Sequence, residues 1–334
     1  MLLVGQRGSG KTTLLQRVAS LLEQSRPLAL AQIEPIAASP EILCQRFLEL
    51  THRAIAPASD SLPPFARFLA SVAAGRRRAV LLLDEVTELR TLSYFPGVEH
   101  PLESFLLAAT SRRAPTILAT SRFPTWIASR LAALPAETRE QISMRHLPPL
   151  SVEELEARRV PQAQGIIRAT RGLPVHVRPL LERMENGQSL PDSLAAELEL
   201  GGRIEAECRA TYFPLLLQAR GYGACKSALH VLADEEGLSL SEISRRMGRT
   251  AGSVRDYLWW LQEVELVTAR EKRFFLADPV LRLWLRMYGR GLPPSPGALS
   301  EEVERHLAEK AAADLPLEPA AQPFLTDDDL IEID

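Results

Sequence analysis

The chain has few cysteines, no long apolar run and almost no excess charge, and each shortage excludes a class of protein. The chain has only 3 cysteines, which are Cys44, Cys208 and Cys225. Because they are isolated in the sequence and odd in number, they predict neither a metal site nor a disulfide framework. No apolar run of about 18 residues predicts a membrane-spanning helix, and no signal peptide precedes the first motif. A formal net charge of −3 gives no general attraction to nucleic acid or membranes. These features favour a cytoplasmic protein.

Internal repeats are also absent, which excludes solenoid and propeller architectures. Hydrophobic residues make up 46% of the chain and charged residues 24%, as in ordinary globular proteins. The 334 residues are enough for two or three domains.

The most specific motif lies near the amino end, where residues 5–12 read Gly-Gln-Arg-Gly-Ser-Gly-Lys-Thr. This is the G-x-x-x-x-G-K-[ST] loop that binds phosphates in nucleoside triphosphatases. Its glycines let successive backbone N–H groups point at phosphate oxygens. The Lys11 ammonium would reach the β- and γ-phosphates, and the Thr12 hydroxyl would ligate Mg²⁺. The predicted nucleotide-binding residues are Gly5, Gln6, Arg7, Gly8, Ser9, Gly10, Lys11, Thr12 and Thr13.

The segments on either side of this loop have the patterns that the motif requires. Residues 2–4 are apolar and predict a buried strand, and residues 12–24 predict an amphipathic helix whose positive end faces the phosphates. The expected apolar face comprises Leu14, Leu15, Val18, Leu21 and Leu22. Because the loop begins at residue 5, either the start codon lies upstream or the adenine site is assembled from other parts of the chain.

A second motif is an apolar strand that ends in two acids. Residues 79–83 are apolar throughout, and Asp84 and Glu85 follow. Asp84 is predicted to emerge at the carboxyl end of the strand and to hold Mg²⁺, the Walker B role. Glu85 would activate the attacking water as a general base, with Lys11 stabilising the developing charge. The alternative is a core strand followed by a solvated acidic turn.

Strand and helix patterns alternate over residues 1–145, which predicts an α/β P-loop domain with a parallel sheet and helices on both faces. Further strands are expected at 28–33 and 116–120, and helices at 40–51, 63–74, 101–111 and 125–134. Residues 146–220 predict a helical lid and connection that begins with a capping box at Ser151 and Glu154. Residues 221–288 predict three helices and a hairpin, the layout of a winged helix-turn-helix.

The remaining residues, 289–334, are rich in proline and acid and are expected to lack a packed core apart from a local helix at 300–312. The acidic end at 327–334 could dock a protein partner. A solvated end is favoured over that alternative.

The predicted winged helix leaves two roles open. Residues 241–275 contain seven basic side chains, Arg245, Arg246, Arg249, Arg255, Arg270, Lys272 and Arg273, against five acids, Glu242, Asp256, Glu263, Glu265 and Glu271. The surplus of two is small for phosphate-driven binding. A structural role against the nucleotide domain is therefore favoured over specific DNA binding.

Four further segments carry a family resemblance. They are residues 120–122 (Thr-Ser-Arg), 147–151 (Leu-Pro-Pro-Leu-Ser), 172–174 (Gly-Leu-Pro) and 276–284 (Leu-Ala-Asp-Pro-Val-Leu-Arg-Leu-Trp). With the two Walker motifs, the chain resembles the archaeal-type AAA+/STAND ATPases over roughly residues 1–288. These ATPases are relatives of the NB-ARC signalling switches and of origin-recognition ATPases.

The resemblance implies roles for individual residues. Thr120 or Ser121 matches the sensor that reads the γ-phosphate, and Arg122 matches an arginine that touches it; the alternative for Arg122 is a surface arginine. Pro174 matches a proline that packs on the adenine, although Gly172 and Pro174 could simply separate two helices.

Two features limit or extend this resemblance. Arg112 and Arg113 could supply an arginine finger in trans within a nucleotide-dependent homo-oligomer, but an exposed basic pair is favoured. The short Gly-Arg-Glu motif that usually precedes the phosphate loop is absent from this sequence.

The resemblance implies a P-loop ATPase that hydrolyses ATP with Mg²⁺ as a nucleotide-controlled conformational switch. ATP is expected rather than GTP by family likeness, and no guanine-reading Asn-Lys-x-Asp motif is present. The alternatives are a DNA-binding regulator or replication or defence accessory protein that uses residues 241–275, and a nucleotide-binding scaffold without turnover.

Overall fold

A computed structural model describes residues 1–25, 27–52, 57–74, 79–111, 115–120, 123–219, 221–289, 291 and 293–312. The chain divides into two compact units, residues 1–147 and 148–334. Each unit is described by itself. None of the described helices is both long enough and apolar enough to span a membrane.

The first unit is built on a five-stranded sheet in the order β2-β3-β4-β1-β5, in which every pairing is parallel. The strands are β1 (Leu2–Val4), β2 (Leu28–Gln32), β3 (Val80–Asp84), β4 (Thr116–Thr120) and β5 (Met144–His146). The predicted α/β fold class is confirmed, and β1–β4 lie within one residue of their expected bounds. The sequence did not predict β5, because all three of its residues are exposed and it has no apolar pattern.

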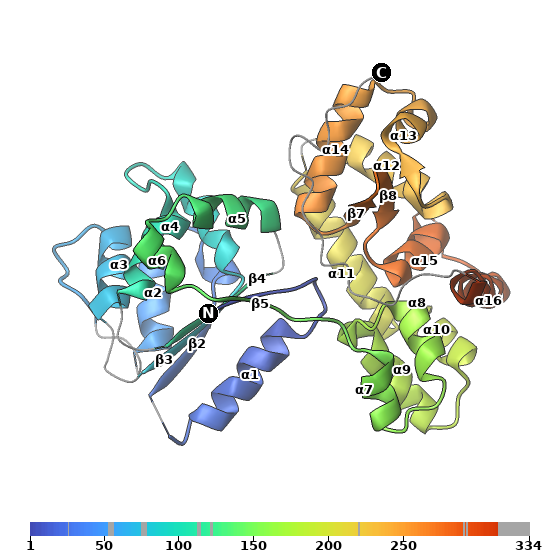
Figure 1. Ribbon diagram of the computed structural model, residues 1–334, viewed down its shortest axis with the longest axis horizontal. Coiled ribbons are helices and arrows are strands. Elements are labelled where there is room, and N and C mark those ends of the chain that lie inside the picture. The colour runs from blue at the N-terminus through green and yellow to red at the C-terminus, as the bar shows by residue number, and fades with distance from the viewer. Residues whose placement is uncertain are drawn as a thin grey trace. The chain divides into compact units, whose positions relative to one another are not determined.

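Helices cover both faces of this sheet (Figure 1). They are α1 (Lys11–Leu22), η1 (Glu34–Ile36), α2 (Pro40–Thr51), α3 (Pro64–Ala74), η2 (Val86–Tyr94), α4 (Pro101–Thr110), α5 (Pro124–Ala132) and α6 (Ala136–Glu140). Alternate residues of a strand point to opposite faces, so each strand contributes to two cores. Leu81 and Leu83 pack with residues of α2, α3, η2 and α4, whereas Val80 and Leu82 pack with Leu15 of α1.

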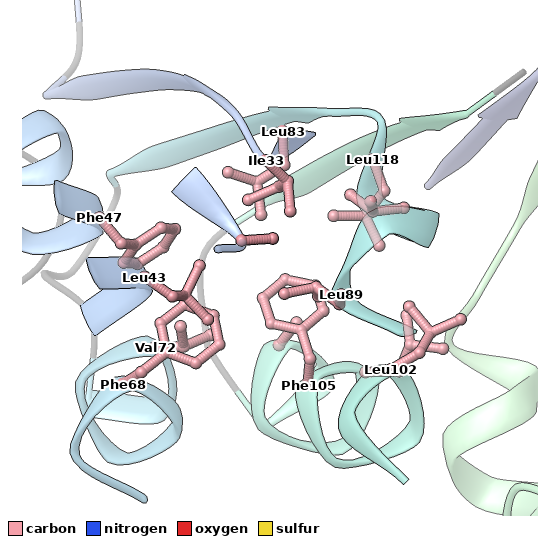
Figure 2. Packing of buried hydrophobic residues seen from close by; sticks show 14 of the residues in the cluster. Ile33, Leu43, Phe47, Phe68, Val72, Leu83, Leu89, Leu102, Phe105 and Leu118 are labelled. Atoms are coloured by element: carbon pink, nitrogen blue, oxygen red, sulfur yellow. The ribbon is translucent and has the colours of Figure 1, made fainter. Parts of the chain in front are cut away.

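The larger core lies on the face covered by α2, α3, η2 and α4. Figure 2 shows Phe47, Phe68 and Phe105, which come from three of these helices, in one cluster with Leu83 of the sheet. The rings of Phe47 and Phe68 meet edge to face with centroids 4.7 Å apart, and Phe68 stacks on Phe105 at 5.8 Å. This packing fixes η2, which directly follows the acidic end of β3.

The expected apolar face of the first helix needs correction. Leu15 is buried, but Leu14 and Leu21 are 37% and 64% exposed. The side chains that pack on the sheet are those of Leu15, Val18, Ala19 and Leu22. Their i, i+3, i+4, i+7 spacing describes one helical stripe, and Leu14 and Leu21 lie outside it.

The second unit is mainly helical. Its first helices are α7 (Val152–Ala157), α8 (Ala163–Thr170), α9 (Pro174–Glu185), α10 (Leu190–Leu198) and α11 (Arg203–Leu217). The predicted capping box is present at the start of α7: Ser151 accepts from the amide of Glu154, and Glu154 accepts from the amide of Ser151.

The next elements are α12 (Tyr222–Asp234), β6 (Leu238–Ser239), α13 (Leu240–Met247), α14 (Ala251–Glu263), β7 (Val267–Arg270), β8 (Arg273–Leu276) and α15 (Pro279–Tyr288). The three strands form an antiparallel sheet in the order β6-β8-β7. The predicted hairpin is therefore present as β7 and β8, and β6 adds a short third strand.

The last described helix, α16 (Pro296–Ala312), differs from expectation. It begins at Pro296 rather than residue 300, and it packs against α8, α10 and α15 instead of lying outside a core. Its buried residues are Leu299, Val303, His306 and Lys310. Their spacing places them on one face of the helix, so residues 296–312 belong to the packed part of the second unit. The acidic end at 327–334 lies outside the described residues.

Ion pairs hold α16 on its neighbours. Arg282 contacts Glu236 at 3.4 Å and Glu309 at 2.9 Å, Arg286 contacts Glu309 at 3.0 Å, and Lys310 contacts Glu236 at 3.1 Å. Both arginine side chains are only 8% exposed. Burial alone would raise the pKa of Glu309, but hydrogen bonds from Arg286 and Arg282 outweigh it and hold that pKa below the ordinary value.

Candidate nucleotide-binding site

The Gly-rich loop lies between β1 and α1, and its backbone needs glycine at two positions. Gly8 has φ 80° and Gly10 has φ 91°, in the left-handed region that side chains disfavour. Gly10 is the residue before α1, so the turn delivers Lys11 and Thr12 directly into the first turn of the helix. Gly5 has little room for a side chain, because a Cβ there would lie 2.9 Å from Ser9 Oγ and 3.0 Å from the Leu147 carbonyl oxygen.

The Lys11 ammonium points into this loop. Its Nζ donates to the carbonyl oxygens of Gly5 at 2.6 Å and Gln6 at 2.9 Å, and it lies 3.3 Å from Ser9 Oγ. The side chain is only 5% exposed although it carries a charge. The loop thus fixes a cation at its centre, where a phosphate oxygen would find both the ammonium and the loop's backbone amides.

The two sequence motifs meet at the carboxyl edge of the sheet. Thr12 Oγ1 donates to Asp84 Oδ2 at 2.5 Å across 72 positions of sequence. Asp84 is the last residue of β3 and is 3% exposed. Its other oxygen, Oδ1, accepts from the backbone N–H of Glu85 at 3.2 Å. The contact exists because the carboxyl ends of parallel strands lie at one edge of a sheet.

Glu85 has an unusual backbone. It lies between β3 and η2 with φ 52° and ψ 48°, the left-handed conformation, which costs a non-glycine residue about 1–2 kcal/mol. The conformation turns the chain directly after Asp84, so β3 ends at Asp84 and η2 begins at Val86 with only Glu85 between them. Such strained positions occur preferentially at functional sites.

The sensor candidate Thr120 lies at the same edge of the sheet. It ends β4, pairs in register with Val4 just before the loop, and is 2% exposed. Its Oγ1 lies 2.8 Å from Thr87 Oγ1, a hydrogen bond that ties β4 to η2. Thr87 was not predicted as a site residue, and its position three residues after Asp84 is the one signal that could have indicated it. Ser121, Arg122, Arg112 and Arg113 lie outside the described residues.

The remaining candidates of the loop surround this centre. Arg7, Thr12 and Thr13 are exposed, and Gln6 is half-buried. The first turn of α1 contains no acidic residue to offset the positive end of the helix. A Thr hydroxyl and a single carboxylate are hard oxygen donors of the kind that Mg²⁺ uses together with phosphate oxygens. Among the described residues, no cluster of three or more His, Cys, Asp or Glu offers an all-protein metal site.

The adenine candidate Pro174 lies in the second unit as the first residue of α9. The preceding Gly172 has φ +69°, and a Cβ there would lie 2.0 Å from the Leu150 carbonyl oxygen. The Gly172 carbonyl accepts from the Leu150 amide at 2.8 Å. Gly172 is thus required by its backbone conformation and by its close approach to the segment that leads into α7.

Within the second unit, residues on either side of the Gly-Leu-Pro segment at 172–174 contact the segment at 276–284, which the sequence did not predict. His176 Nε2 lies 2.6 Å from Asp278 Oδ2, and Arg171 donates to the Ala277 carbonyl at 2.8 Å. Asp278 also caps α15 by accepting from the Val280 amide at 2.8 Å. Burial alone would raise the pKa of Asp278, but the His176 ring and the backbone amides hold it below its ordinary value.

Comparisons with known proteins bear on the fold of the chain. The family model described as an AAA domain matches residues 1–119. The Walker-type ATPase of Pyrococcus abyssi superposes with a TM-score of 0.60 at 19% identity, covering 86% of this chain and 90% of that chain. The Aeropyrum pernix ORC2 protein, solved as ADPNP-ADP complexes, gives a TM-score of 0.48 at 14% identity, with 93% and 88% covered. No curated protein sequence matches the chain.

The matched region contains the Gly-rich loop, the Asp84 strand and most of β4. The structural likeness to the Pyrococcus protein shows that the two share a fold. Residues 1–119 thus match the AAA domain model, and the chain has the α/β fold of P-loop NTPases.

Proposed function

We propose that the chain binds Mg²⁺–ATP at the Gly-rich loop and hydrolyses it as a nucleotide-controlled switch. The observation that carries this proposal is the 2.5 Å hydrogen bond between Thr12 and Asp84. It joins the hydroxyl of Thr12 to a buried carboxylate, and Lys11, whose ammonium points into the loop, directly precedes Thr12. Mg²⁺ and the terminal phosphates require these groups.

In this proposal each side chain has one task. Lys11 exchanges its contacts with the Gly5 and Gln6 carbonyls for phosphate oxygens. Thr12 and Asp84 hold the metal, which supplies charge neutralisation at the phosphates when bound. Thr120 reads the γ-phosphate and passes its position to η2 through Thr87.

Glu85 is proposed to orient and deprotonate the attacking water. Glu85 directly follows Asp84, the proposed metal ligand, and its left-handed backbone supports a functional role. Arg122 is proposed to stabilise the charge that develops on the γ-phosphate.

The second unit is proposed to be the element that responds to the nucleotide. The contacts of His176 with Asp278 and of Arg171 with Ala277 join α9 to α15, so the proposed lid and the carboxyl-terminal elements would move together. Pro174 is proposed to pack on the adenine in the ATP state.

We interpret α12–β8 as a winged helix, with α14 in the position of a recognition helix. A DNA-binding role is the second candidate, because Arg255 is exposed on α14 and Trp259 is 51% exposed there. Two of its basic side chains are already paired, Arg246 with Glu235 at 2.6 Å and Arg273 with Glu242 at 3.7 Å. This pairing weakens the field that phosphates would meet, so the switch is the preferred function.

The test compares phosphate release from ATP by the wild type and by Glu85→Gln. We expect turnover to fall at least 100-fold while ATP affinity stays within about threefold, because the substitution removes a base but no phosphate contact. Glu99→Gln, an exposed acid in the same unit, is the matched control and should turn over normally. Normal hydrolysis by Glu85→Gln would eliminate the proposed base.

A further inference from the structure

The two compact units are joined by a short segment that contains two prolines. Residues 147–150 read Leu-Pro-Pro-Leu, and the boundary between the units falls after Leu147. We call this segment the Pro-Pro connection. A proline has no backbone N–H, so only the two ends of the connection can donate a backbone hydrogen bond. Both ends do: the Leu147 amide donates to the Val4 carbonyl at 2.8 Å, and the Leu150 amide donates to the Gly172 carbonyl at 2.8 Å.

The first end lies against the Gly-rich loop. Val4, which accepts from Leu147, directly precedes Gly5. A Cβ added at Gly5 would lie 3.0 Å from the Leu147 carbonyl oxygen and 3.4 Å from the Leu147 Cβ. The Leu147 side chain also packs on the core cluster that contains Leu3 and Leu15. Because these contacts are close, the backbone at Gly5 cannot shift toward Leu147 without displacing it.

A bound nucleotide changes what holds Gly5. The Lys11 ammonium donates to the Gly5 carbonyl at 2.6 Å, which is a charge-assisted hydrogen bond. In the proposed function, Lys11 exchanges this carbonyl for phosphate oxygens, so the Gly5 peptide group loses the ammonium as a partner. The backbone at Gly5 then has two arrangements, one with Lys11 on its carbonyl and one with Lys11 on phosphate.

The second end is held against the segment that begins α9. A Cβ added at Gly172 would lie 2.0 Å from the Leu150 carbonyl oxygen, so the two backbones are in direct contact. Gly172 lies two residues before Pro174, the first residue of α9. Ser151, the residue after Leu150, caps α7 by accepting from the Glu154 amide at 3.2 Å. A displacement of Leu150 therefore acts on the starts of both α7 and α9.

The two prolines make the connection stiff. Each proline ring fixes φ near about −65°, and a residue before a proline is kept out of the helical region, which here applies to Leu147 and Pro148. Three steps between Cα atoms reach at most about 11 Å. A connection this short and this restricted passes a displacement from one end to the other instead of absorbing it.

We propose that the Pro-Pro connection transmits the occupancy of the Gly-rich loop to the segment at Gly172. The inference rests on the proposed binding of ATP at the loop. Phosphate draws Lys11 from the Gly5 carbonyl, the Gly5 backbone shifts against Leu147, and the prolines carry the displacement to Leu150. This route does not require Pro174 to pack on the adenine, so the two ways of informing the second unit can be separated.

The experiment measures the distance between the two units by double electron–electron resonance on the full chain. Spin labels are attached at Gln45→Cys on α2 and Ser227→Cys on α12, both exposed positions, and the three native cysteines are buried. We expect the distance maximum of the labelled chain to shift between Mg²⁺–ADP and a non-hydrolysable ATP analogue. Pro148→Gly/Pro149→Gly should abolish this shift and broaden the distribution, because glycine leaves φ unrestricted.

Calorimetry on the same proteins separates this proposal from the proposed function. Pro148→Gly/Pro149→Gly should bind the ATP analogue within about threefold of wild type, because it removes no phosphate contact. The matched control Pro135→Gly/Pro161→Gly replaces two exposed prolines outside the connection and should shift as wild type does.

Each remaining outcome overturns the proposal. A full shift in Pro148→Gly/Pro149→Gly overturns the connection alone and leaves the nucleotide switch standing, as does a shift that only Pro174→Ala abolishes. A wild type that binds nucleotide without any shift overturns both the connection and the switch. A wild type that binds no nucleotide overturns the site itself and the connection with it.

Discussion

His306 makes the second unit sensitive to acid. It is fully buried on α16, and its Nε2 lies 3.1 Å from the Ala169 carbonyl oxygen. The neutral ring satisfies this contact with one N–H. A charged ring would carry a second N–H on Nδ1, for which the described residues provide no acceptor. Burial, together with the nearby cations Lys310, Arg286 and Arg282, lowers the pKa of His306 to about 4.

The sign of the pH effect follows from this lowered pKa. The unfolded chain protonates His306 near the ordinary pKa of 6.5, whereas the folded chain resists protonation until about 4. Between these values the unfolded state binds more protons, so the free energy of unfolding decreases as the pH falls. The gap corresponds to about 3 kcal/mol in total, of which about 2 kcal/mol is lost by roughly pH 5.

The assay is urea unfolding followed by tryptophan fluorescence, because Trp259, Trp260 and Trp284 report on the second unit. His306→Gln keeps an N–H donor for Ala169 and cannot titrate, so it is the reference at each pH. We expect the stability of the wild type relative to His306→Gln to fall by about 2 kcal/mol between pH 7.5 and pH 5. A difference that is the same at both pH values would refute the argument that a buried neutral histidine anchors α16.

Two further predictions concern the contacts within the second unit. Gly172→Ala should lower the free energy of unfolding by more than about 3 kcal/mol, because its Cβ would lie 2.0 Å from the Leu150 carbonyl at a positive φ. Gly187→Ala is the control, because Gly187 has φ +87° but open space around it, and its replacement should lower the free energy of unfolding by only about 1 kcal/mol. Equal losses for the two variants in denaturant unfolding would contradict the steric argument. Asp278→Ala removes the cap of α15 and the partner of buried His176, and it should lower the free energy of unfolding by about 3 kcal/mol. The control Asp192→Ala, at an exposed position, should lower it by only about 0.5 kcal/mol. A thermal unfolding profile in which both aspartate variants match the wild type would remove the proposed link between α9 and α15.

The parts of the fold that could be predicted are those that local pattern determines. The apolar run before Asp84 is typical of a strand buried on both faces, and the spaced glycines before Lys11 are typical of a turn that leads into a helix. The capping box at Ser151 is also a local pattern, because it depends only on Ser151 and Glu154. Thus the Gly-rich loop, β3 and the start of α7 all lie where the sequence predicted them.

What could not be predicted depends on contacts between residues far apart in the chain. His176 and Asp278 are 102 positions apart, and no local pattern pairs them. In the sequence, α16 looks like a charged surface segment, because the partners of its Glu309 and Lys310 are Arg282 and Glu236, which lie outside the helix. The exposed strand β5 has no apolar pattern and forms only because β1 offers it an edge.

The central claim is that the Gly-rich loop binds a nucleotide through Lys11. Isothermal calorimetry of Mg²⁺–ATP binding to the wild type, Lys11→Ala and the control Lys226→Ala tests it most directly. The account predicts saturable binding with one site for the wild type and Lys226→Ala, and at least 100-fold weaker binding for Lys11→Ala, because a buried ammonium at the phosphates is lost. Equal affinity of Lys11→Ala and wild type, or no binding by folded wild type, would contradict it.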